Sequence, residues 1–319
     1  MSVHQRSTKT IALRPYLRAR LQQVAFPLML RLLLSSPELQ FATRKVASPK
    51  NILVSTRHGE VRMLIYAPPA GAPEYEAGPP VHFITHGGGF ILRKPEQEDN
   101  VARYLASEVG CYVVLPDYHT APQVQFPVAE EESFDCLEWV RSNAAVQGWD
   151  SGNLSVGGGS AGTKFAVSII QQLLDAGDPL PVALTCEYGA IDLSRDDSTR
   201  HSPLRSPMVS TSVMKLVRAT YFNGVDVKDP FVSPILDPRL DRFPPTLILN
   251  AENDTLRQEM EDFGAALKAA GVSVTMHCFP GVDHLFTHFK PVETARQAIE
   301  MIGAHLSAAY HNRQSTNGP

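Results

Sequence analysis

The sequence has little of what marks disulfide-rich, zinc-binding or membrane-spanning proteins. Its 319 residues include only 4 cysteines, and no two of them have the C-x-x-C spacing of a zinc site or a redox motif. No apolar run reaches the roughly 18 residues of a membrane-spanning helix, because Pro27 and Arg31 interrupt the segment 24–34. The cysteines lie in apolar stretches, and we expect four buried, reduced thiols: Cys111, Cys136, Cys186 and Cys278.

An excess of positive charge is also missing. Lys and Arg number 29 against 33 Asp and Glu, which gives a net charge of −4 at pH 7. Nucleic-acid binding needs cationic side chains against the phosphate backbone, so a small-molecule partner is expected and a nucleic acid is not. The polar first ten residues lack the pattern of a secretory signal. We therefore expect a cytoplasmic protein with no integral membrane segment, and we leave a homodimer open.

Hydrophobic residues, at 43%, are enough for one large α/β domain with a sizeable core. Short apolar runs alternate with helical patterns, which predicts a mostly parallel sheet flanked by helices. Ahead of these runs, segments 52–56 and 60–66 flank a three-residue loop, Arg57 to Gly59, and predict a β-hairpin. The apolar runs are 81–85, 112–115, 154–156, 182–187, 246–250 and 272–279.

Two segments break this rhythm and predict a helical cap. In residues 11–44, leucines and arginines recur at helical spacing, which predicts one or two amphipathic helices whose apolar face covers the main domain as a lid. Attachment to a membrane surface is the alternative. Residues 191–225 read as an insertion. The expected parts are 1–45 (N-terminal part of the cap), 46–190 (core, first part), 191–225 (cap insertion) and 226–319 (core, second part).

Residues 158–162, Gly-Gly-Ser-Ala-Gly, carry the strongest local signal for chemistry. They follow a predicted strand and precede a predicted helix, as in a nucleophile elbow, where a serine sits on a tight and strained turn between small residues. Upstream, the run His86-Gly87-Gly88-Gly89-Phe90 follows another buried strand. Its unhindered backbone N–H groups, together with that of Ala161, predict an oxyanion hole for acyl transfer.

A serine nucleophile needs a base and a carboxylate that orients the base. The strand 246–250 is followed by Asp254, and the strand 272–279 is followed by His284, so both candidates lie where active sites of α/β proteins form. We predict His284 as the base, with His288 as its rival. We predict Asp254 as the acid, with Glu252 as its rival and a structural helix N-cap as the alternative role.

At this point the chain resembles the hormone-sensitive-lipase family of α/β-hydrolases, also called bacterial esterase family IV. The resemblance implies an α/β-hydrolase fold with a helical cap, a Ser160–Asp254–His284 triad, an oxyanion hole from Gly88, Gly89 and Ala161, and no metal or organic cofactor. It implies a serine carboxylesterase acting on small or short-to-medium-chain esters. The matching motifs, in family order, are HGGGF (86–90), DYHTAP (117–122), GGSAG (158–162), DPFVSP (229–234), AENDTLRQE (251–259) and GVDHLF (281–286).

The chain departs from the family pattern at two places in the elbow. Family members usually carry an acidic residue before the serine, where this chain has Gly159, and a glycine where it has Thr163. The segment 119–123 likewise replaces the family's usual arginine, leucine and glutamate. These changes do not affect the predicted nucleophile, acid or base, because Ser160, Asp254 and His284 are all present.

An apolar substrate pocket is expected under the cap. Its candidate residues could equally pack against the N-terminal helices. They are Phe90, Met208, Val213, Leu216, Val217, Tyr221 and Leu285.

Three other functions fit part of the sequence. An amidase or deformylase would use the same triad, and a catalytically silent small-molecule receptor would keep the fold alone. Residues 157–162 also satisfy G-x-G-x-x-G, with Glu187 at the end of the next predicted strand, as in a dinucleotide-binding protein. This last reading leaves the HGGGF run, Asp254 and His284 unexplained.

Overall fold

The computed structural model describes residues 6, 7, 9–33 and 37–316 of the chain, with the side chains of 26–33 and 313–316 excepted. Arg31, which belongs to the predicted amphipathic pattern, lies outside the described side chains.

One eight-stranded sheet organises the molecule, in the order β1-β2-β4-β3-β5-β6-β7-β8. Strand β2 is antiparallel to both of its neighbours, and the other pairs are parallel. The central strands are buried along their whole length, as expected of a parallel sheet that is covered on both faces. The strands are β1 Lys50–Thr56, β2 Gly59–Tyr66, β3 Val81–Thr85, β4 Tyr112–Asp117, β5 Leu154–Gly159, β6 Leu184–Glu187, β7 Thr246–Ala251 and β8 Val274–Phe279.

Each predicted strand is present, and the hairpin differs from its prediction in one detail. Gly59 pairs with Thr56 as the first residue of β2, so the loop consists of Arg57 and His58 instead of three residues. The Arg57 side chain bonds Asp135 of α3 (Val128–Gln147), which fixes this loop against the domain.

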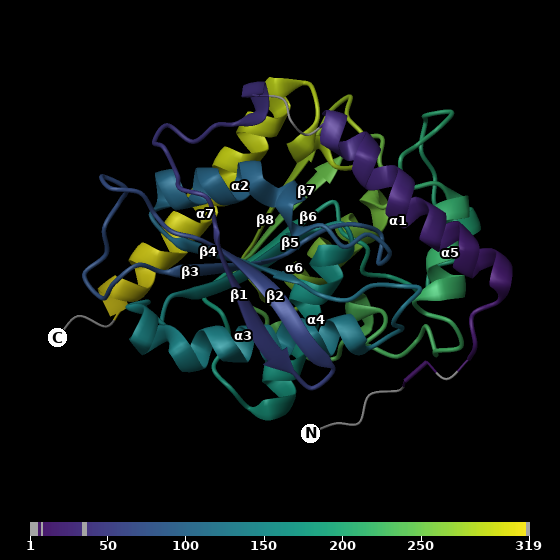
Figure 1. Cartoon of the computed structure of the whole chain (residues 1–319), viewed down its shortest axis with the longest axis horizontal. Helices are drawn as coiled ribbons and strands as arrows, with labels where there is room; N and C mark the ends of the chain where they lie inside the picture. Colours follow the sequence, from purple (N-terminus) through teal and green to yellow (C-terminus); the bar gives the residue numbers. More distant parts are fainter. Residues whose placement is uncertain (1–5, 8, 34–36, 317–319) are drawn as a thin grey trace.

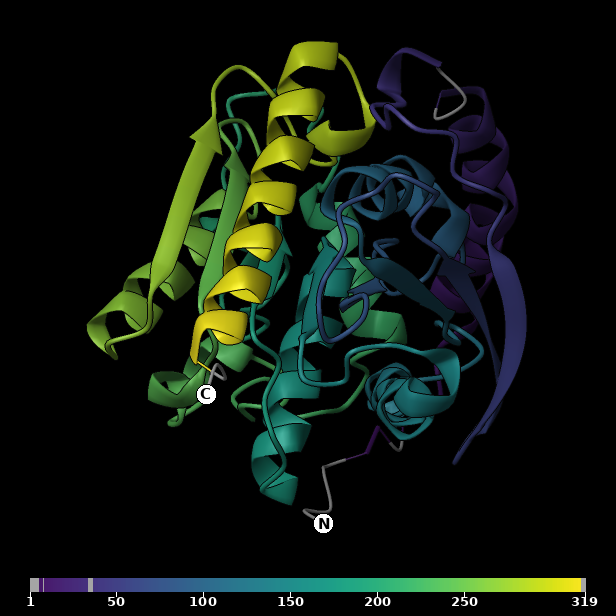
Figure 2. The ribbon, with the colours of Figure 1, turned by 90° about the vertical axis from the view of Figure 1, so that its left-hand side faces the viewer.

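Helices cover both faces of the sheet (Figures 1 and 2). Helices α2 (Asp99–Tyr104) and α7 (Val292–Thr316) pack with one face around buried residues such as Leu105 and Ile299. Helices α3, α4 (Ala161–Ala176) and α6 (Arg257–Ala269) cover the other face around Ile170 and Phe263. The shorter segments are η1 Pro37–Leu39, η2 Pro95–Glu98, η3 Leu105–Val109, η4 Asp197–Thr199, η5 Pro234–Leu236, η6 Leu240–Arg242 and η7 Phe286–His288.

Helices α1 (Leu13–Leu33) and α5 (Thr211–Thr220) lie together at one side of the molecule (Figure 1). The prediction that the apolar face of α1 covers the domain is wrong for its described side chains. Leu13, Leu17 and Leu21 are exposed, whereas Ala19 is buried. Periodicity reveals a stripe on a helix, but a stripe can face either the protein or the outside.

Among the described residues, no helix has the length and apolar character needed to cross a membrane. The cysteines are free thiols, as predicted, and three of them are buried. Cys278 is only half-buried, because β8 is an edge strand of the sheet.

Candidate active site

Ser160 is the single residue between the end of β5 and the start of α4, as the elbow motif predicts. Its backbone has φ 57° and ψ −124°, a conformation that costs a non-glycine residue free energy and that persists only where neighbours enforce it. The Ser160 N–H donates to the Glu187 carbonyl at 2.8 Å, and its carbonyl accepts from Ala190 at 3.2 Å. These bonds to the end of β6 hold the turn and present the hydroxyl to the pocket described below.

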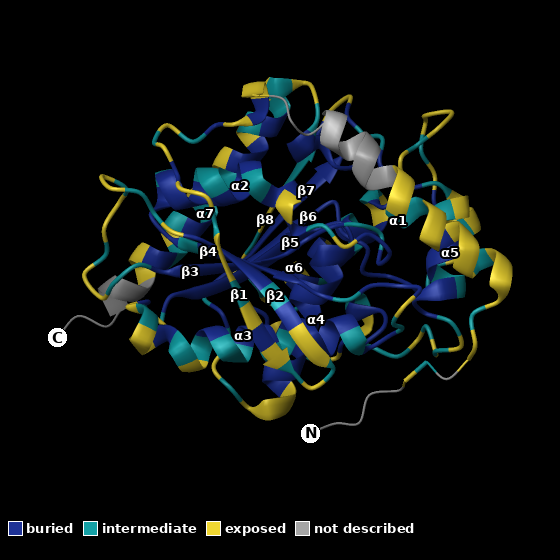
Figure 3. Cartoon of the chain, viewed as in Figure 1, coloured by how far each residue is buried: buried dark blue, intermediate teal, exposed yellow. Residues whose placement is uncertain are grey.

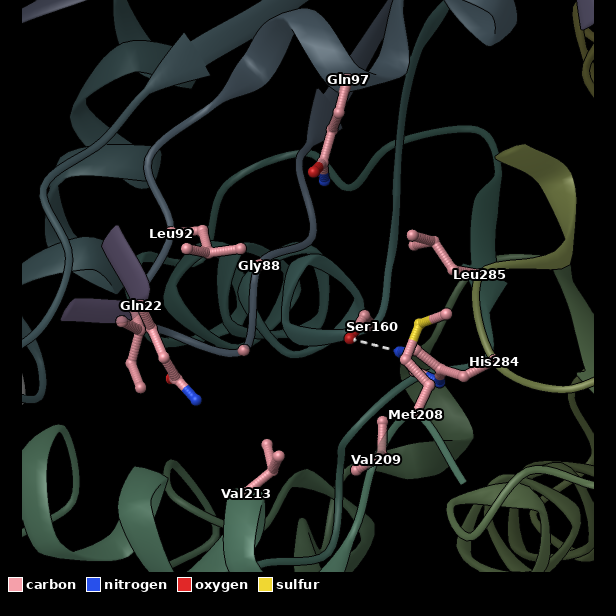
Figure 4. Close-up of a pocket in the computed structure, with 12 residues that line it drawn as sticks. Gln22, Gly88, Leu92, Gln97, Ser160, Met208, Val209, Val213, His284 and Leu285 are labelled. Atoms are coloured by element: carbon pink, nitrogen blue, oxygen red, sulfur yellow. Dashed lines mark hydrogen bonds between the residues drawn. The ribbon is translucent and has the colours of Figure 1, made fainter. Parts of the chain in front are cut away.

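A chain of hydrogen bonds joins Ser160 to the predicted base and acid. His284 Nε2 lies 2.8 Å from Ser160 Oγ, and His284 Nδ1 lies 2.7 Å from Asp254 Oδ2 (Figure 4 shows the first of these). Asp254 Oδ1 also accepts from the Leu256 N–H at 3.0 Å. The carboxylate thus fixes the imidazole with Nδ1 protonated, which leaves Nε2 free to accept the serine proton.

The two rivals lie elsewhere. Glu252 is exposed and its Oε2 accepts from the Gly281 N–H at 2.7 Å, so it steadies the loop that carries His284 without touching the imidazole. His288 is buried with its Nε2 3.1 Å from Glu98 Oε2, and it does not reach Ser160.

A second serine–histidine pair, Ser155 and His82, is buried between β5 and β3 at 2.8 Å. Burial lowers the pKa of His82 to about 3, and Ser155 is also bonded to Tyr310. Neither residue lines the pocket beside Ser160, so this pair belongs to the interior of the sheet.

The glycine run after β3 forms a tight turn at the pocket. Gly88 has φ 136°, and a Cβ there would lie 2.7 Å from the Leu92 carbonyl oxygen, so the turn requires glycine. Within the described part of the chain, the N–H groups of Gly88, Gly89 and Ala161 donate to no protein acceptor. Gly88 and Gly89 line the pocket with Ser160, and Ala161 begins α4, so unengaged donors gather around the hydroxyl.

The pocket beside Ser160 has a volume of about 120 Å³. Three of the predicted lining residues, Met208, Val213 and Leu285, border it (Figure 4). Sequence reasoning missed the rest of the wall. Ile91 and Leu92 directly follow the HGGGF run, and this position could have identified them as lining residues. No sequence feature identifies the other three, which are Gln22, Gln97 and Val209.

Phe90, Leu216, Val217 and Tyr221 do not line this pocket, contrary to expectation. They are buried in the cluster that joins the cap to the domain. The Phe90 ring packs against Phe165 and Tyr221 with centroids 5.4 Å from each, in a turn where its φ is 61°. These four side chains therefore pack between the cap and the domain and do not form the pocket wall.

The two departures in the elbow each have a neighbour that accounts for them. A Cβ at Gly159 would lie 2.8 Å from the Tyr188 ring, which occupies the space beside the serine and packs edge-on against His284. Thr163 fills the space where a Cβ at Gly189 would otherwise lie, at 2.5 Å, and its hydroxyl donates to the Gly158 carbonyl at 2.6 Å. In each case a side chain of one segment fills the space next to a glycine of the other.

The changed segment 119–123 has partners of its own. His119 Nδ1 lies 2.7 Å from Glu132 Oε1 on α3. Gln123 bonds the amide of Gln23 on α1, and Gln23 Nε2 also donates to the carbonyls of Ile91 and Ala121 at 2.9 and 2.8 Å. The segment therefore ties α1 to the loop after the glycine run.

Glu187, the last residue of β6, has a buried carboxyl group. Its Oε1 has no hydrogen-bond partner among the described residues, and burial raises the pKa of the carboxyl to about 8. A buried, protonated carboxyl is not placed to bind a ribose hydroxyl. Gly158 and Gly162 pack against the Thr85 carbonyl, so close packing accounts for these glycines of the G-x-G-x-x-G match.

We expect Glu187→Gln to change how stability depends on pH. The folded protein binds the Glu187 proton more tightly than the unfolded chain, so this group's stabilising contribution is complete at low pH and is lost as pH rises towards about 8. Glutamine cannot ionise, so the variant does not lose this contribution to the free energy of unfolding as pH rises. Between about pH 5 and about pH 9, the variant's free energy of unfolding should therefore gain about 2–4 kcal/mol relative to wild type in urea titrations. Glu60→Gln, an exposed change on β2, should show no such gain, and equal pH slopes for wild type and Glu187→Gln would contradict the expectation.

In the part of the chain that the structure describes, no three His, Cys, Asp or Glu side chains gather as they would to hold a metal ion.

The comparisons with known proteins agree with this architecture. A model of the alpha/beta hydrolase fold family matches residues 82–288. Carboxylesterase NlhH of Mycobacterium tuberculosis is 31% identical over 91% of this chain and 87% of its own length. An acetyl-hydrolase of Streptomyces hygroscopicus is 29% identical over 70% of this chain and 74% of its own. A solved esterase of Pyrobaculum calidifontis superposes with a TM-score of 0.81 at 30% identity, covering 93% of this chain and 94% of that one.

The family match spans both the glycine run and His284, and the relatives align over the core and much of the cap. With the sheet order, the elbow and the hydrogen-bonded Ser160, His284 and Asp254, these findings show that the chain belongs to the α/β-hydrolase family, in the hormone-sensitive-lipase group that its motifs resemble.

Proposed function

We propose that this protein is a serine carboxylesterase that hydrolyses small carboxylic esters through an acyl-enzyme on Ser160. The observation that carries the proposal is the hydrogen-bonded chain from Ser160 through His284 to Asp254 at the edge of a mostly apolar pocket. The names of the relatives, a carboxylesterase and an acetyl-hydrolase, support the same class of substrate.

In the first half of the reaction, Ser160 Oγ attacks the ester carbonyl carbon while His284 Nε2 takes the hydroxyl proton. The carbonyl oxygen becomes an oxyanion, which the N–H groups of Gly88, Gly89 and Ala161 stabilise as donors already in place. The tetrahedral intermediate collapses, the ester C–O bond breaks, and the alcohol leaves with the proton from His284. The acid portion of the ester stays bound to Ser160.

In the second half, His284 Nε2 takes a proton from water as the water oxygen attacks the acyl carbon. The second oxyanion forms at the same donors, and its collapse breaks the bond to Ser160 Oγ, which recovers its proton from His284. The products are a carboxylic acid and the free enzyme. Asp254 holds the imidazolium in place in both halves without taking a proton.

Turnover of a chromogenic acetyl ester, set beside the matching aryl amide, tests the reaction class. We expect the ester to be hydrolysed faster, because its leaving group needs less help from the acid step. Faster amide hydrolysis would point to the amidase alternative, and no turnover of either compound would point to the silent receptor.

We also propose that residues 1–45 and 191–225 form the cap over the pocket. Ala19 of α1 and Val217 of α5 share one buried cluster. At the other side of the insertion, Arg200 donates to Glu259 of α6 at 2.6 Å, with both side chains buried. The cap supplies Gln22, Met208 and Val213 to the pocket wall. A cytoplasmic location and assembly as a homodimer stay predictions.

Val213→Trp is expected to narrow the acyl preference. Val213 lies on α5 and borders the pocket, so an indole there fills space that a long acyl chain would occupy. The ratio of kcat/KM for an octanoyl ester to that for an acetyl ester should fall about tenfold or more, a difference of about 1.4 kcal/mol. Lys215→Trp, an exposed change on the same helix, should leave the ratio unaltered. An equal effect of both substitutions would remove α5 from the substrate pocket.

A further inference from the structure

Helix α1 presents an apolar stripe to the outside of the molecule, and Figure 3 shows that much of this helix is exposed. Leu13, Leu17, Leu21 and Val24 are 70%, 56%, 67% and 73% exposed, and their spacing puts them on one face of the helix. The inner face, with Ala19 and Gln23, already makes the contacts that hold the helix to the domain. Removing the outer stripe would therefore break none of those contacts. A continuous exposed apolar stripe of this kind marks an interaction surface.

The charges around this stripe are of one sign. Residues 1–37 contain six Lys and Arg and no Asp or Glu, although the whole chain carries a net charge of −4. The insertion has a smaller excess of the same sign, because residues 191–225 contain five Lys and Arg and three Asp. The cap is therefore basic and the rest of the protein is acidic, a separation that directs this side towards an anionic surface.

The basic side chains beside the stripe have no acidic partner among the described residues. Arg18 reaches only the Ser212 hydroxyl at 3.4 Å, and Arg20 only the Gln23 side-chain oxygen at 2.8 Å. Among the residues that the structure describes, neither of them, nor Arg14, forms an ion pair. Their charges remain available to an external partner.

The stripe also adjoins the pocket. Gln22, on the inner side of the same helix, borders the cavity beside Ser160 opposite Met208 (Figure 4). Met208 is itself 38% exposed, and Leu204, earlier in the insertion, is 39% exposed. Helix α1 therefore carries both the exposed stripe and one residue of the pocket wall.

We propose that the outer face of α1 binds an anionic lipid surface, with the helix lying in the interfacial plane. Exposed leucines on the outer face, arginines beside them and no acidic residue in the helix form a combination that suits an anionic lipid surface. The arginines meet lipid phosphates while the stripe enters the boundary with the acyl chains. A second copy of this chain fits less well, because pairing two such faces would bring like charges together.

The test is co-sedimentation with vesicles of phosphatidylcholine, with or without about one third phosphatidylglycerol. We expect the full-length protein to bind the anionic vesicles at least tenfold more tightly than the neutral ones, and added salt to weaken that binding. Two variants of α1 should each lose at least tenfold of it: one replaces Leu13, Leu17, Leu21 and Val24 by Gln, and the other replaces Arg14, Arg18 and Arg20 by Gln.

The matched control replaces two exposed apolar residues away from α1, Leu53 on β1 and Val146 on α3, by Gln, and should bind like wild type. Vesicle binding is read without turnover, so the outcome does not depend on the proposed esterase function, and an unchanged thermal unfolding midpoint shows that each variant is folded. Equal binding to both kinds of vesicle, or equal loss in the control, would overturn the proposal. So would self-association in sedimentation velocity that the leucine variant abolishes, because the stripe would then bind a second copy.

Discussion

Ser160→Ala is expected to lower kcat for a chromogenic ester on the order of 10⁶-fold, as loss of the serine does in a serine protease. At about 1.4 kcal/mol for each factor of ten, this is roughly 8 kcal/mol of transition-state stabilisation. No other residue near the pocket can form the same acyl bond, because the nearby Ser155 is buried within the sheet. What remains should be the contribution of binding and of the oxyanion donors.

The variant should fold as the wild type does. Among the described residues, Ser160 Oγ bonds only His284, whereas the elbow is held by the backbone bonds of Ser160. Ser168→Ala is the matched control: it removes a buried hydroxyl from α4 that bonds the Phe165 carbonyl, and it should keep full activity. Retention of a tenth of wild-type kcat by Ser160→Ala would refute the nucleophile, as would an organophosphate label that mass spectrometry maps to another residue.

Asp254→Asn is expected to lower kcat on the order of 10⁴-fold, the loss seen for the equivalent change in a protease triad. The structure explains why the amide is a clean test. Asparagine keeps an oxygen to accept from the Leu256 N–H, so the start of α6 is preserved, but it cannot stabilise a protonated His284. The substitution therefore separates the catalytic role of Asp254 from its role at the helix terminus.

Glu252→Gln is the control for the acid. This rival carboxylate lies two residues away on the same loop, and among the described residues its side chain bonds only the Gly281 N–H. Its kcat should stay within about threefold of wild type. A larger loss from Glu252→Gln than from Asp254→Asn would reverse the assignment of the acid. Combining Asp254→Asn with Ser160→Ala should cost little more than Ser160→Ala alone, since the residues of a triad act as one unit.

The sequence was sufficient to predict the sheet and the three residues that meet at the site. Each follows a short apolar strand, and the parallel strands β5, β7 and β8 bring their carboxyl ends to the same edge of the sheet. Residues far apart in the chain are therefore neighbours once the strand order is known. The chemistry of serine, histidine and aspartate is carried by residue type, which a sequence displays directly.

The orientation of the cap could not be predicted in the same way. Leu17 in α1 and Leu216 in α5 are both leucines at helical spacing, yet Leu17 is exposed and Leu216 is buried. Which way such a face turns depends on the opposing surface, here the turn around Phe90 and the aromatic side chains beside it. The pocket wall depends on the same packing, which is why Val213 borders the pocket and Tyr221 does not.

The close contacts of Gly159 with Tyr188 and of Thr163 with Gly189 limit which substitutions the residues around Ser160 can accept. A consensus design would restore the family's acid at 159 and its glycine at 163, one substitution at a time. The acid would collide with Tyr188, and the glycine would leave an unfilled space against Gly189. Each reversion becomes acceptable only after its partner has changed, for example Tyr188→Ala before Gly159→Asp, or Gly189→Ala together with Thr163→Gly. We therefore expect the members of each pair to be coupled in double-mutant cycles, and single-site libraries around Ser160 would miss combinations in which both members change.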